Sequence, residues 1–195
     1  RADDALFRSD NYSNTTPTFT DLSSSLPISG YYPSDIEAHP SIQNTVYITI
    51  HNDVYKSTKK GSTWTNISGN LPNISMNCIV IDTSSTNDAL YVGTDAGVYY
   101  KDNSLSNWVL YIDGMPAAAE VTELEIYYNA NSSLSSIVAA TYGRGLWQSE
   151  LYSSGAALPL ADFGYNDEVI CTGDTIWFTD STLFSPTTWS WSFNP

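Results

Sequence analysis

Positively charged residues are scarce in this chain, and their scarcity limits what the protein can bind. Lysine and arginine together number 7, against 21 aspartate and glutamate residues, so the net charge is -14. Nucleic acids are bound through clusters of lysine and arginine that neutralise phosphates. A nucleic-acid partner is therefore not expected. The excess of carboxylates is more simply a solvated surface that keeps the protein soluble.

Charged residues of both signs are also few, at 14% compared with about 25% in typical soluble domains. Serine, threonine and asparagine take their place, and aromatic residues reach 13%. β-Branched and aromatic residues fit a pleated, half-buried surface, while asparagine, serine, glycine and proline supply turns. This composition predicts an all-β protein.

Only two cysteines are present, Cys78 and Cys171. A single pair cannot define a disulfide framework, so the redox compartment is left open. We expect Cys78 to be a small buried strand residue. No apolar run approaches the length of about 18 residues that spans a membrane. The opening RADDALFRSD resembles a strand rather than a signal peptide, which suggests an internal part of a longer protein.

A repeat organises the sequence. Three similar segments end at Pro27, Pro72 and Pro116, spaced 45 and 44 residues apart, and a shortened fourth copy is Leu146 to Leu151. The stretches between them also align, and each contains short apolar runs separated by serine- and asparagine-rich turns. A period of about 45 residues with four strands is typical of β-propeller blades.

The expected strands fall into groups of two, four, four and three. Their ranges are 6–9 and 18–22; 35–38, 45–50, 54–57 and 63–67; 77–82, 89–94, 97–101 and 108–112; 122–127, 136–141 and 146–151. Thirteen strands do not close a propeller, and an open arc would leave unpaired edges. We therefore expect the protein to continue N-terminally, with an early strand that completes the last blade.

The turn STKKGSTW resembles the Asp-box, the Ser-x-Asp-x-Gly-x-Thr-Trp hairpin of bacterial neuraminidase repeats found in sialidase, xyloglucanase and sortilin-type propellers. The matching positions are Ser57, Lys59, Gly61, Thr63 and Trp64, with Lys59 where the family has aspartate. Gly61 permits a positive φ, and Trp64 supplies apolar area to anchor the outer strand. The resemblance implies a structural element remote from any catalytic face.

The segment AATYGRGLWQSEL looks like the final blade of such propellers in secreted Bacteroidota proteins, and the sequence after it is similar to the first half of a PKD domain. The matching residues are Phe163, Cys171, Gly173, Phe178, Asp180 and the run Trp189 to Phe193. The alternation of WSWSF suits a half-buried sandwich strand. The resemblance leaves Cys171 free to pair with a cysteine of the other half.

These resemblances imply a fold class and a domain order. We expect a partial β-propeller of about three blades of four-stranded antiparallel sheets in residues 1–152, followed by a linker in 153–159. Residues 160–195 would form an incomplete immunoglobulin-like β-sandwich.

Loops that converge on one face of a propeller usually carry its function. The candidates in the turns between second and third strands are His51, Asn52, Asp53, Asp95, Tyr142 and Arg144. Tyr31, Tyr32 and Glu120 lie in or near the connections between blades. An arginine with aromatic and carboxylate groups could bind carbohydrate or a protein carboxylate. The alternative is ordinary turn chemistry.

Catalysis finds little support in the sequence. His39 and His51 form no metal-like pair and are expected to be exposed turn residues, and there is no Gly-x-Ser-x-Gly elbow. Asp53 and Asp95 are left open as a glycosidase pair. No calcium-binding loop pattern occurs, so we predict no metal site and no cofactor, with calcium an unsupported alternative.

We therefore expect a non-catalytic binding or spacer region of a large secreted or outer-membrane-surface protein. Its partners would be carbohydrate or protein on the extracellular side, and the remaining blades and PKD half of the same protein. The resemblance to Bacteroidota surface proteins also implies export by a C-terminal signal of the type IX kind. Two alternatives stay open: part of a secreted glycoside hydrolase of xyloglucanase or sialidase type, and a receptor-like propeller that binds peptides.

Overall fold

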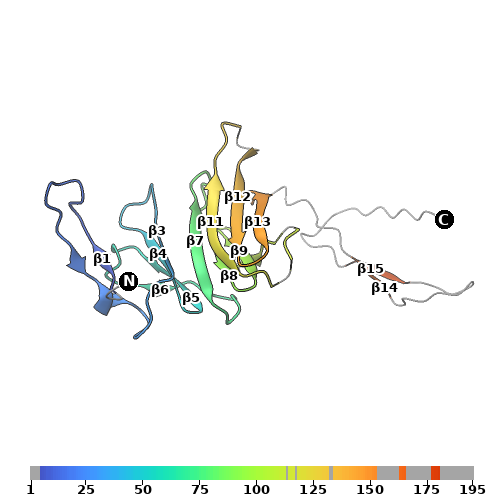
Figure 1. Cartoon of the computed structure of the whole chain (residues 1–195), viewed down its shortest axis with the longest axis horizontal. Helices are drawn as coiled ribbons and strands as arrows, with labels where there is room; N and C mark the ends of the chain where they lie inside the picture. The colour runs from blue at the N-terminus through green and yellow to red at the C-terminus, as the bar shows by residue number, and fades with distance from the viewer. Residues whose placement is uncertain are drawn as a thin grey trace, which may run out of the picture. The chain divides into compact units, whose positions relative to one another are not determined.

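The computed structural model describes residues 5–112, 114–116, 118–131, 134–152, 163–165 and 177–180. The chain divides into two units, Arg1–Leu151 and Tyr152–Pro195. Apart from a single 3-10 turn at Ser23–Ser25, the described secondary structure consists of antiparallel strands, so the predicted all-β class is confirmed (Figure 1). No helix among the described residues has the length and apolar character needed to cross a bilayer.

The first unit contains four sheets, which we number I to IV. Sheet I pairs β1 (Phe7–Arg8) with β2 (Thr20–Asp21), and sheet II orders β3 (Asp35–Ala38), β4 (Val46–Ile50), β5 (Asp53–Ser57) and β6 (Thr65–Asn66). Sheet III orders β7 (Met76–Asp82), β8 (Ala89–Thr94), β9 (Gly97–Lys101) and β10 (Val109–Leu110), and sheet IV orders β11 (Val121–Tyr127), β12 (Ser136–Thr141) and β13 (Gly145–Glu150). The predicted groups of two, four, four and three strands are confirmed.

The outer strands are shorter than the sequence indicated. β2, β6 and β10 each have two residues, whereas the apolar and aromatic residues around them predicted about five. Thr63 and Trp64 belong to the turn that precedes β6 rather than to the strand. Side chains that are apolar but belong to a turn can pack on a neighbouring sheet without joining the ladder of backbone hydrogen bonds.

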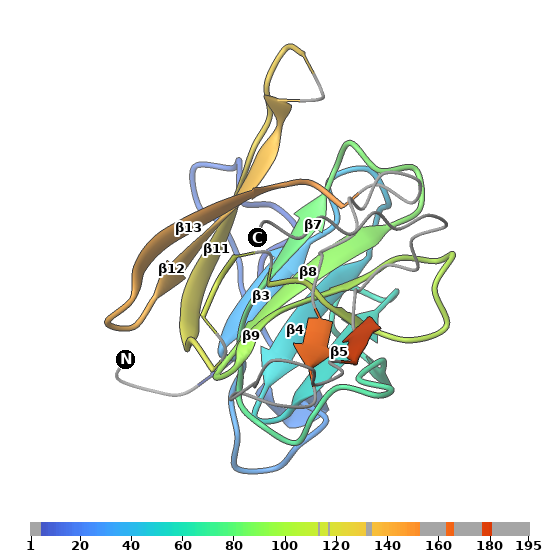
Figure 2. The same ribbon diagram turned by 90° about the vertical axis from the view of Figure 1, so that its right-hand side faces the viewer.

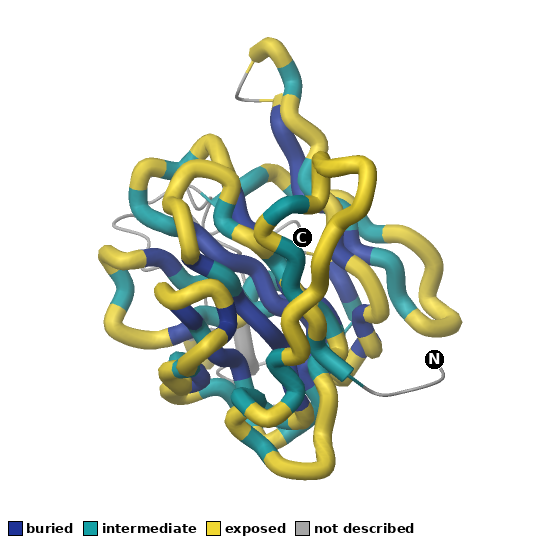
Figure 3. The backbone as a smooth tube through the Cα atoms, turned by 90° about the vertical axis from the view of Figure 1, so that its left-hand side faces the viewer, coloured by how far each residue is buried: buried dark blue, intermediate teal, exposed yellow. Residues whose placement is uncertain are grey.

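Adjacent sheets pack through their apolar faces. Between sheets II and III the core consists of Tyr47, Val54, Met76, Ile79, Ile81, Leu90, Val92 and Trp108, none of them more than 4% exposed. All six residues of β8 are buried, because this inner strand is covered on both faces. Figure 3 shows the buried stretches running along the strands and the exposed ones along the turns. Burial of these apolar side chains is the main favourable term in folding.

The first strands of sheets II, III and IV lie side by side, with β7 in contact with both β3 and β11 (Figure 2). The Ile79 N–H donates to the Asp35 carboxylate over 2.9 Å, and the Asn77 side-chain amide donates to the Val121 carbonyl over 3.0 Å. These bonds join strands of different sheets that share no ladder. Polar side chains therefore satisfy inner-edge groups of β7 and β11, the Ile79 N–H and the Val121 carbonyl.

Sheets III and IV approach closely where β7 and β8 meet β11. A Cβ added at Gly93 would lie 2.4 Å from the Cys78 sulfur and 2.7 Å from a Val121 methyl group. Cys78 is 2% exposed and in no disulfide, which confirms the prediction of a buried strand cysteine. Burial, followed by the charges of Glu123 and Asp35, raises the pKa of its thiol to about 12.

In the first two repeats, the residue that precedes the Leu-Pro pair clasps the next sheet. Asn70 donates to the Trp108 carbonyl over 2.9 Å and accepts from the Trp108 N–H over 2.7 Å. One repeat earlier, the Ser25 hydroxyl donates to the Gly61 carbonyl over 2.7 Å. The proline-terminated motif seen in the sequence therefore closes the outer edge of one sheet onto its neighbour.

The lysine-containing turn between β5 and β6 is organised by Ser57. Its hydroxyl accepts hydrogen bonds from the Lys59 N–H over 3.1 Å and the Gly61 N–H over 2.9 Å. Gly61 has a φ of +79°, which a residue without Cβ adopts at no steric cost. The neighbouring Lys60 ammonium pairs with the Asp10 carboxylate of sheet I over 2.8 Å. Lysine in this turn therefore links two sheets.

In the second unit the structure describes one antiparallel hairpin of β14 (Phe163–Tyr165) and β15 (Phe178–Asp180), with Phe163 opposite Asp180. The linker 153–159, Cys171, Gly173 and the run Trp189 to Phe193 lie outside the described residues.

Candidate functional site

The turns between second and third strands lie along one connected edge of sheets II to IV. The Met76 N–H donates to the His51 carbonyl over 2.9 Å, and the Asp95 N–H donates to the Ser75 carbonyl over 3.3 Å. The Tyr142 N–H donates to the Glu120 carbonyl over 2.8 Å in the same way. In each case the connection between two sheets is hydrogen-bonded beside a turn that the sequence singled out. We call this edge the turn face; it comprises residues 51–53, 73–77, 95–96, 119–121 and 142–144.

His51 is exposed, as predicted, and has a φ of +56°. Its imidazole ring lies edge-on to the ring of Tyr31, with ring centroids 4.3 Å apart and an interplanar angle of 61°. Tyr31 is 47% exposed and the adjacent Tyr32 42% exposed. Aromatic rings that remain accessible in this way offer apolar faces together with polar edges to a ligand.

Asn52 and Asp53 have different partners. The Asn52 amide donates to the Asn73 side chain over 2.7 Å. The carboxylate of Asp53 accepts from Asn66 over 3.0 Å, from the Ser68 hydroxyl over 2.8 Å and from the Tyr55 hydroxyl over 3.3 Å. Asp53 thus holds β5 to the end of β6, whereas the two asparagines leave amide groups at the surface.

Asp95 is exposed and its carboxylate accepts from the Asn77 amide over 3.1 Å. The same amide nitrogen donates to the Val121 carbonyl over 3.0 Å. Asp95 therefore takes part in the link between sheets III and IV. The two carboxylates left open as a glycosidase pair, Asp53 and Asp95, both have donors that fit a structural role.

Tyr142 and Arg144 lie on the turn between β12 and β13, and Tyr142 is 76% exposed. The Arg144 carbonyl accepts from the Trp147 indole over 2.9 Å, while its side chain makes no ion pair within the described part of the chain. No hydrogen bond or ring contact in the described part of the chain joins these two residues to His51, Asn52 or Asp53. The sequence candidates thus form two separate clusters on the turn face.

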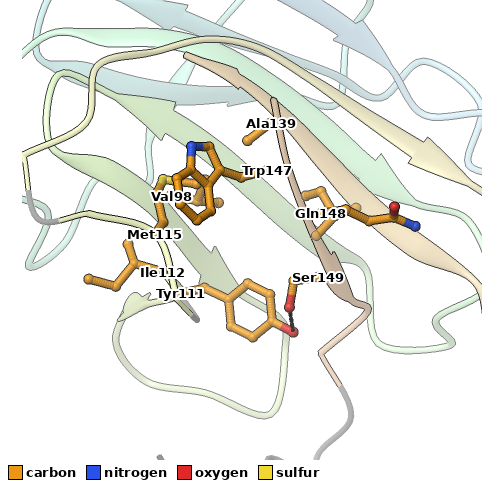
Figure 4. A pocket seen from close by; sticks show the side chains of 9 residues that line it. Val98, Tyr111, Ile112, Met115, Ala139, Trp147, Gln148 and Ser149 are labelled. Atoms are coloured by element: carbon orange, nitrogen blue, oxygen red, sulfur yellow. Dashed lines mark hydrogen bonds between the residues drawn. The ribbon is translucent and has the colours of Figure 1, made fainter. Parts of the chain in front are cut away.

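A small pocket lies between sheets III and IV (Figure 4). It is lined by Tyr111, Trp147 and Ser149 among others, and the Ser149 hydroxyl donates to Tyr111 over 3.4 Å. Its volume of about 20 Å³ is near that of one water molecule. It is therefore a gap in sheet packing rather than a ligand site.

The prediction that His39 is an exposed turn residue is wrong. Its side chain is 10% exposed, and Nε2 lies 3.1 Å from the Asp88 carboxylate. The Nδ1 atom accepts from the N–H groups of Ser41 and Ile42 over 3.1 and 2.9 Å. No signal in the sequence indicates this arrangement, because Asp88 belongs to the next repeat and reaches His39 only when sheets II and III pack together.

Asp88 also accepts from Lys56 over 2.7 Å and from the Tyr47 hydroxyl over 2.8 Å. Burial alone would raise the pKa of this carboxyl. The hydrogen bonds from Lys56 and Tyr47, with the charges of Lys56 and His39, outweigh burial and hold its pKa below the ordinary value. This cluster therefore links sheets II and III by charge.

Within the described residues, no group of three or more histidine, cysteine, aspartate or glutamate side chains is placed to hold a metal ion. Comparison with known proteins found no matching family model and no similar sequence among curated proteins. The assignment of function therefore depends on the geometry of the turn face.

Proposed function

We propose that sheets I to IV are successive blades of a β-propeller and that the protein is a non-catalytic binding module. The support for the architecture is the repeat of about 45 residues, the antiparallel sheets, and the first strands of sheets II to IV lying side by side. The hydrogen bonds that join sheet I to sheet II and sheet II to sheet III add to it. In this proposal the turn face is the binding face, and its ligand is a carbohydrate or a protein surface.

The observation that carries the binding function is the pair of accessible rings at Tyr31 and His51, next to the amides of Asn52 and Asn73. Rings that stack on apolar faces and amides that both donate and accept are the groups that recognise neutral polar ligands. The second cluster, Tyr142 and Arg144, adds an exposed aromatic ring and a cation suited to a carboxylate.

A catalytic function has weaker support. A glycosidase needs one carboxyl group that donates a proton and another that attacks or activates water. Asp53 accepts three hydrogen bonds within sheet II, and Asp95 is engaged with Asn77. These donors occupy carboxylate oxygens that a substrate would need. The hydrolase alternative therefore rests on residues outside this face.

The proposed setting is extracellular, on a large secreted or surface-attached protein in which these blades precede a PKD-like module. The resemblance of residues 160–195 to that module and the low content of charged residues support this setting. The role would be adhesion, or spacing of other modules from the surface.

The test is binding of the purified chain to a glycan array and to extracellular-matrix proteins, compared between two tyrosine variants. Tyr31→Ala removes a ring that lies against the turn-face residue His51, and it is expected to weaken binding about tenfold or more, the loss typical of an aromatic contact residue. Tyr12→Ala is the matched control, because Tyr12 is 81% exposed and lies in the β1–β2 hairpin. Equal binding by both variants would contradict the assignment of the face. Tyr142→Ala and Arg144→Ala then decide which cluster contributes.

A further inference from the structure

We propose that the cleft between sheets I and II is a docking site for a two-stranded β-hairpin, which adds to the open edge of β1 and covers the exposed side of β3 and the start of β4. This inference concerns a different surface from the turn face and does not depend on the proposed ligand. It starts from a cavity of about 340 Å³ between the two sheets. Its walls include Phe7, Leu22, Ile36 and Val46, with Arg8 and Lys60 among the polar residues.

The floor of the cleft is a position that is buried in sheets III and IV. Ile36, Ile79 and Leu124 occupy the same place in the first strands of sheets II, III and IV, each opposite the residue two before the end of the second strand. Ile79 and Leu124 are both 3% exposed, whereas Ile36 is 44% exposed. The difference arises from the neighbouring sheet rather than from the residue, since all three are branched aliphatic side chains.

The missing cover can be identified from the next interface. Ile79 packs in a core to which sheet II contributes Tyr47 of its second strand and Val54 of its third. Among the described residues, sheet I consists of β1 and β2, which correspond to the third and fourth strands of sheet II. No described residue of sheet I takes the place of the strand that carries Tyr47. The cavity is therefore where the first two strands of a sheet would lie.

The backbone of β1 is ready to pair with such a strand. The Leu6 carbonyl accepts from the Leu22 N–H over 2.7 Å, so the polar groups of Leu6 face β2. Backbone groups alternate in direction along a strand, and those of Phe7 therefore face the opposite edge. In sheet II the corresponding residue, Tyr55, pairs on that edge with Ile48 of β4. An incoming strand would find an N–H and a carbonyl at Phe7, beside an apolar wall.

A buried hydrogen-bond donor in the sheet II wall of the cleft indicates that sheet I packs on sheet II differently from the way sheet II packs on sheet III. Trp108 of sheet III donates its indole N–H to the Ile67 carbonyl of sheet II over 2.8 Å. Trp64, at the matching position of sheet II, lines the cleft, and its buried indole N–H has no partner among the described residues. Buried donors are normally paired.

A β-hairpin is favoured over other occupants because it continues an interface that the molecule already has. The contacts between sheets II and III are made by strands whose side chains alternate between the two faces, with aromatic and branched residues in the core. The same chemistry fits the apolar wall around Ile36, and strand addition also satisfies the open edge of β1. A sugar would leave the apolar wall without a matching surface.

The probe is a synthetic peptide with the chain's own residues 35–50, DIEAHPSIQNTVYITI, which comprise a first and second strand. It is titrated calorimetrically into the whole 195-residue chain. Saturable binding is expected, and Ile36→Glu should weaken it about tenfold or more because a charge would be buried against the peptide. Ile42→Glu is the matched control, since Ile42 is 47% exposed and lies outside the cleft.

Ala38→Glu, at a second exposed position of the cleft, gives an independent variant if Ile36→Glu misfolds. Hydrogen exchange adds a local measurement: the Phe7 amide should become protected when the peptide is bound. The proposal is overturned if the wild-type chain shows no saturable binding, or if Ile36→Glu and Ile42→Glu bind equally. It is also overturned if sedimentation shows a dimer that Ile36→Glu dissociates, because a second copy would then be the occupant.

Discussion

Asp88 shows how a single carboxylate can join two sheets. The carboxylate precedes β8 of sheet III, while its partners His39, Tyr47 and Lys56 all belong to sheet II. The side chain is 7% exposed, so its charge is compensated by neighbours rather than by water. Removing one member of such a cluster leaves the others buried without a partner, which costs more than the loss of an exposed ion pair.

We predict that Asp88→Asn lowers the free energy of unfolding by about 1 to 3 kcal/mol near neutral pH, the usual effect of losing hydrogen bonds to a charged group. The pKa of Asp88 is lowered in the folded state from its ordinary value of 3.8. Its contribution is therefore complete above pH 3.8 and declines as the pH falls through the folded pKa. Urea unfolding at a series of pH values should show that the difference in the free energy of unfolding between the wild type and Asp88→Asn becomes smaller in acid.

The control for this experiment is Asp10→Asn. The Asp10 carboxylate also pairs with a lysine over 2.8 Å, but its side chain is 49% exposed. Exposed pairs contribute little, so this variant should unfold much like the wild type. A difference for Asp88→Asn that stayed constant into acid would show that its charge is not the source of the stability.

At the scale of elements, the outer strands depend on contacts beyond their own ladders. β10 has two residues, and so few backbone pairs do not hold a strand. The strand is fixed instead by Asn70, which makes two hydrogen bonds with the Trp108 main chain, and by the buried ring of Trp108. The loop before one sheet therefore determines where the edge of that sheet ends.

We predict that Asn70→Ala lowers the free energy of unfolding by about 1 to 3 kcal/mol, because it leaves a buried main-chain donor and acceptor without partners. The Trp108 amide should exchange its hydrogen faster than in the wild type. Asn103→Ala is the matched control, since Asn103 is exposed and no side-chain hydrogen bond to another described residue holds it. An unchanged rate of hydrogen exchange at the Trp108 amide in Asn70→Ala would contradict the role given to Asn70.

For the whole molecule, the dominant electrostatic feature is uncompensated negative charge. The net charge is -14, and the ion pairs in the described residues involve only Asp10 and Asp88 as acids. The first strands carry further carboxylates close together. Burial, followed by the charges of Asp35 and Glu125, raises the pKa of Glu37. Like charges at this spacing oppose the compact state.

We predict that sodium chloride stabilises the protein. Raising its concentration from about 20 mM to about 500 mM shortens the screening length to less than half, so repulsion among the carboxylates weakens and the melting temperature should rise by a few degrees. Differential scanning calorimetry gives this value directly. Glu37→Gln should make the rise in melting temperature with salt smaller, because it removes one of the interacting charges. A melting temperature that falls with salt would show that attractive pairs dominate instead.

Much of the fold could be predicted from the sequence, because its signals are local. Alternating apolar residues, turn residues and the spacing of the Leu-Pro motif indicated the strands and their grouping into sheets. The candidate site was predicted less well. Asp53 and Asp95 were recognised as residues of the correct turns, but their partners Ser68 and Asn77 lie in other segments. Only the packing of those segments shows that both carboxylates are already engaged.

The sequence by itself determined the all-β character, the order of the strands and the scarcity of positive charge. The tertiary structure decided which equivalent residues are buried. Ile36 and Ile79 have the same side chain and the same place in their sheets, yet only Ile79 is covered. Alternation along a strand specifies the direction of a side chain, whereas burial also requires an opposing surface. For His39 that surface is Asp88 of the next sheet; beside Ile36 the described structure leaves a cleft.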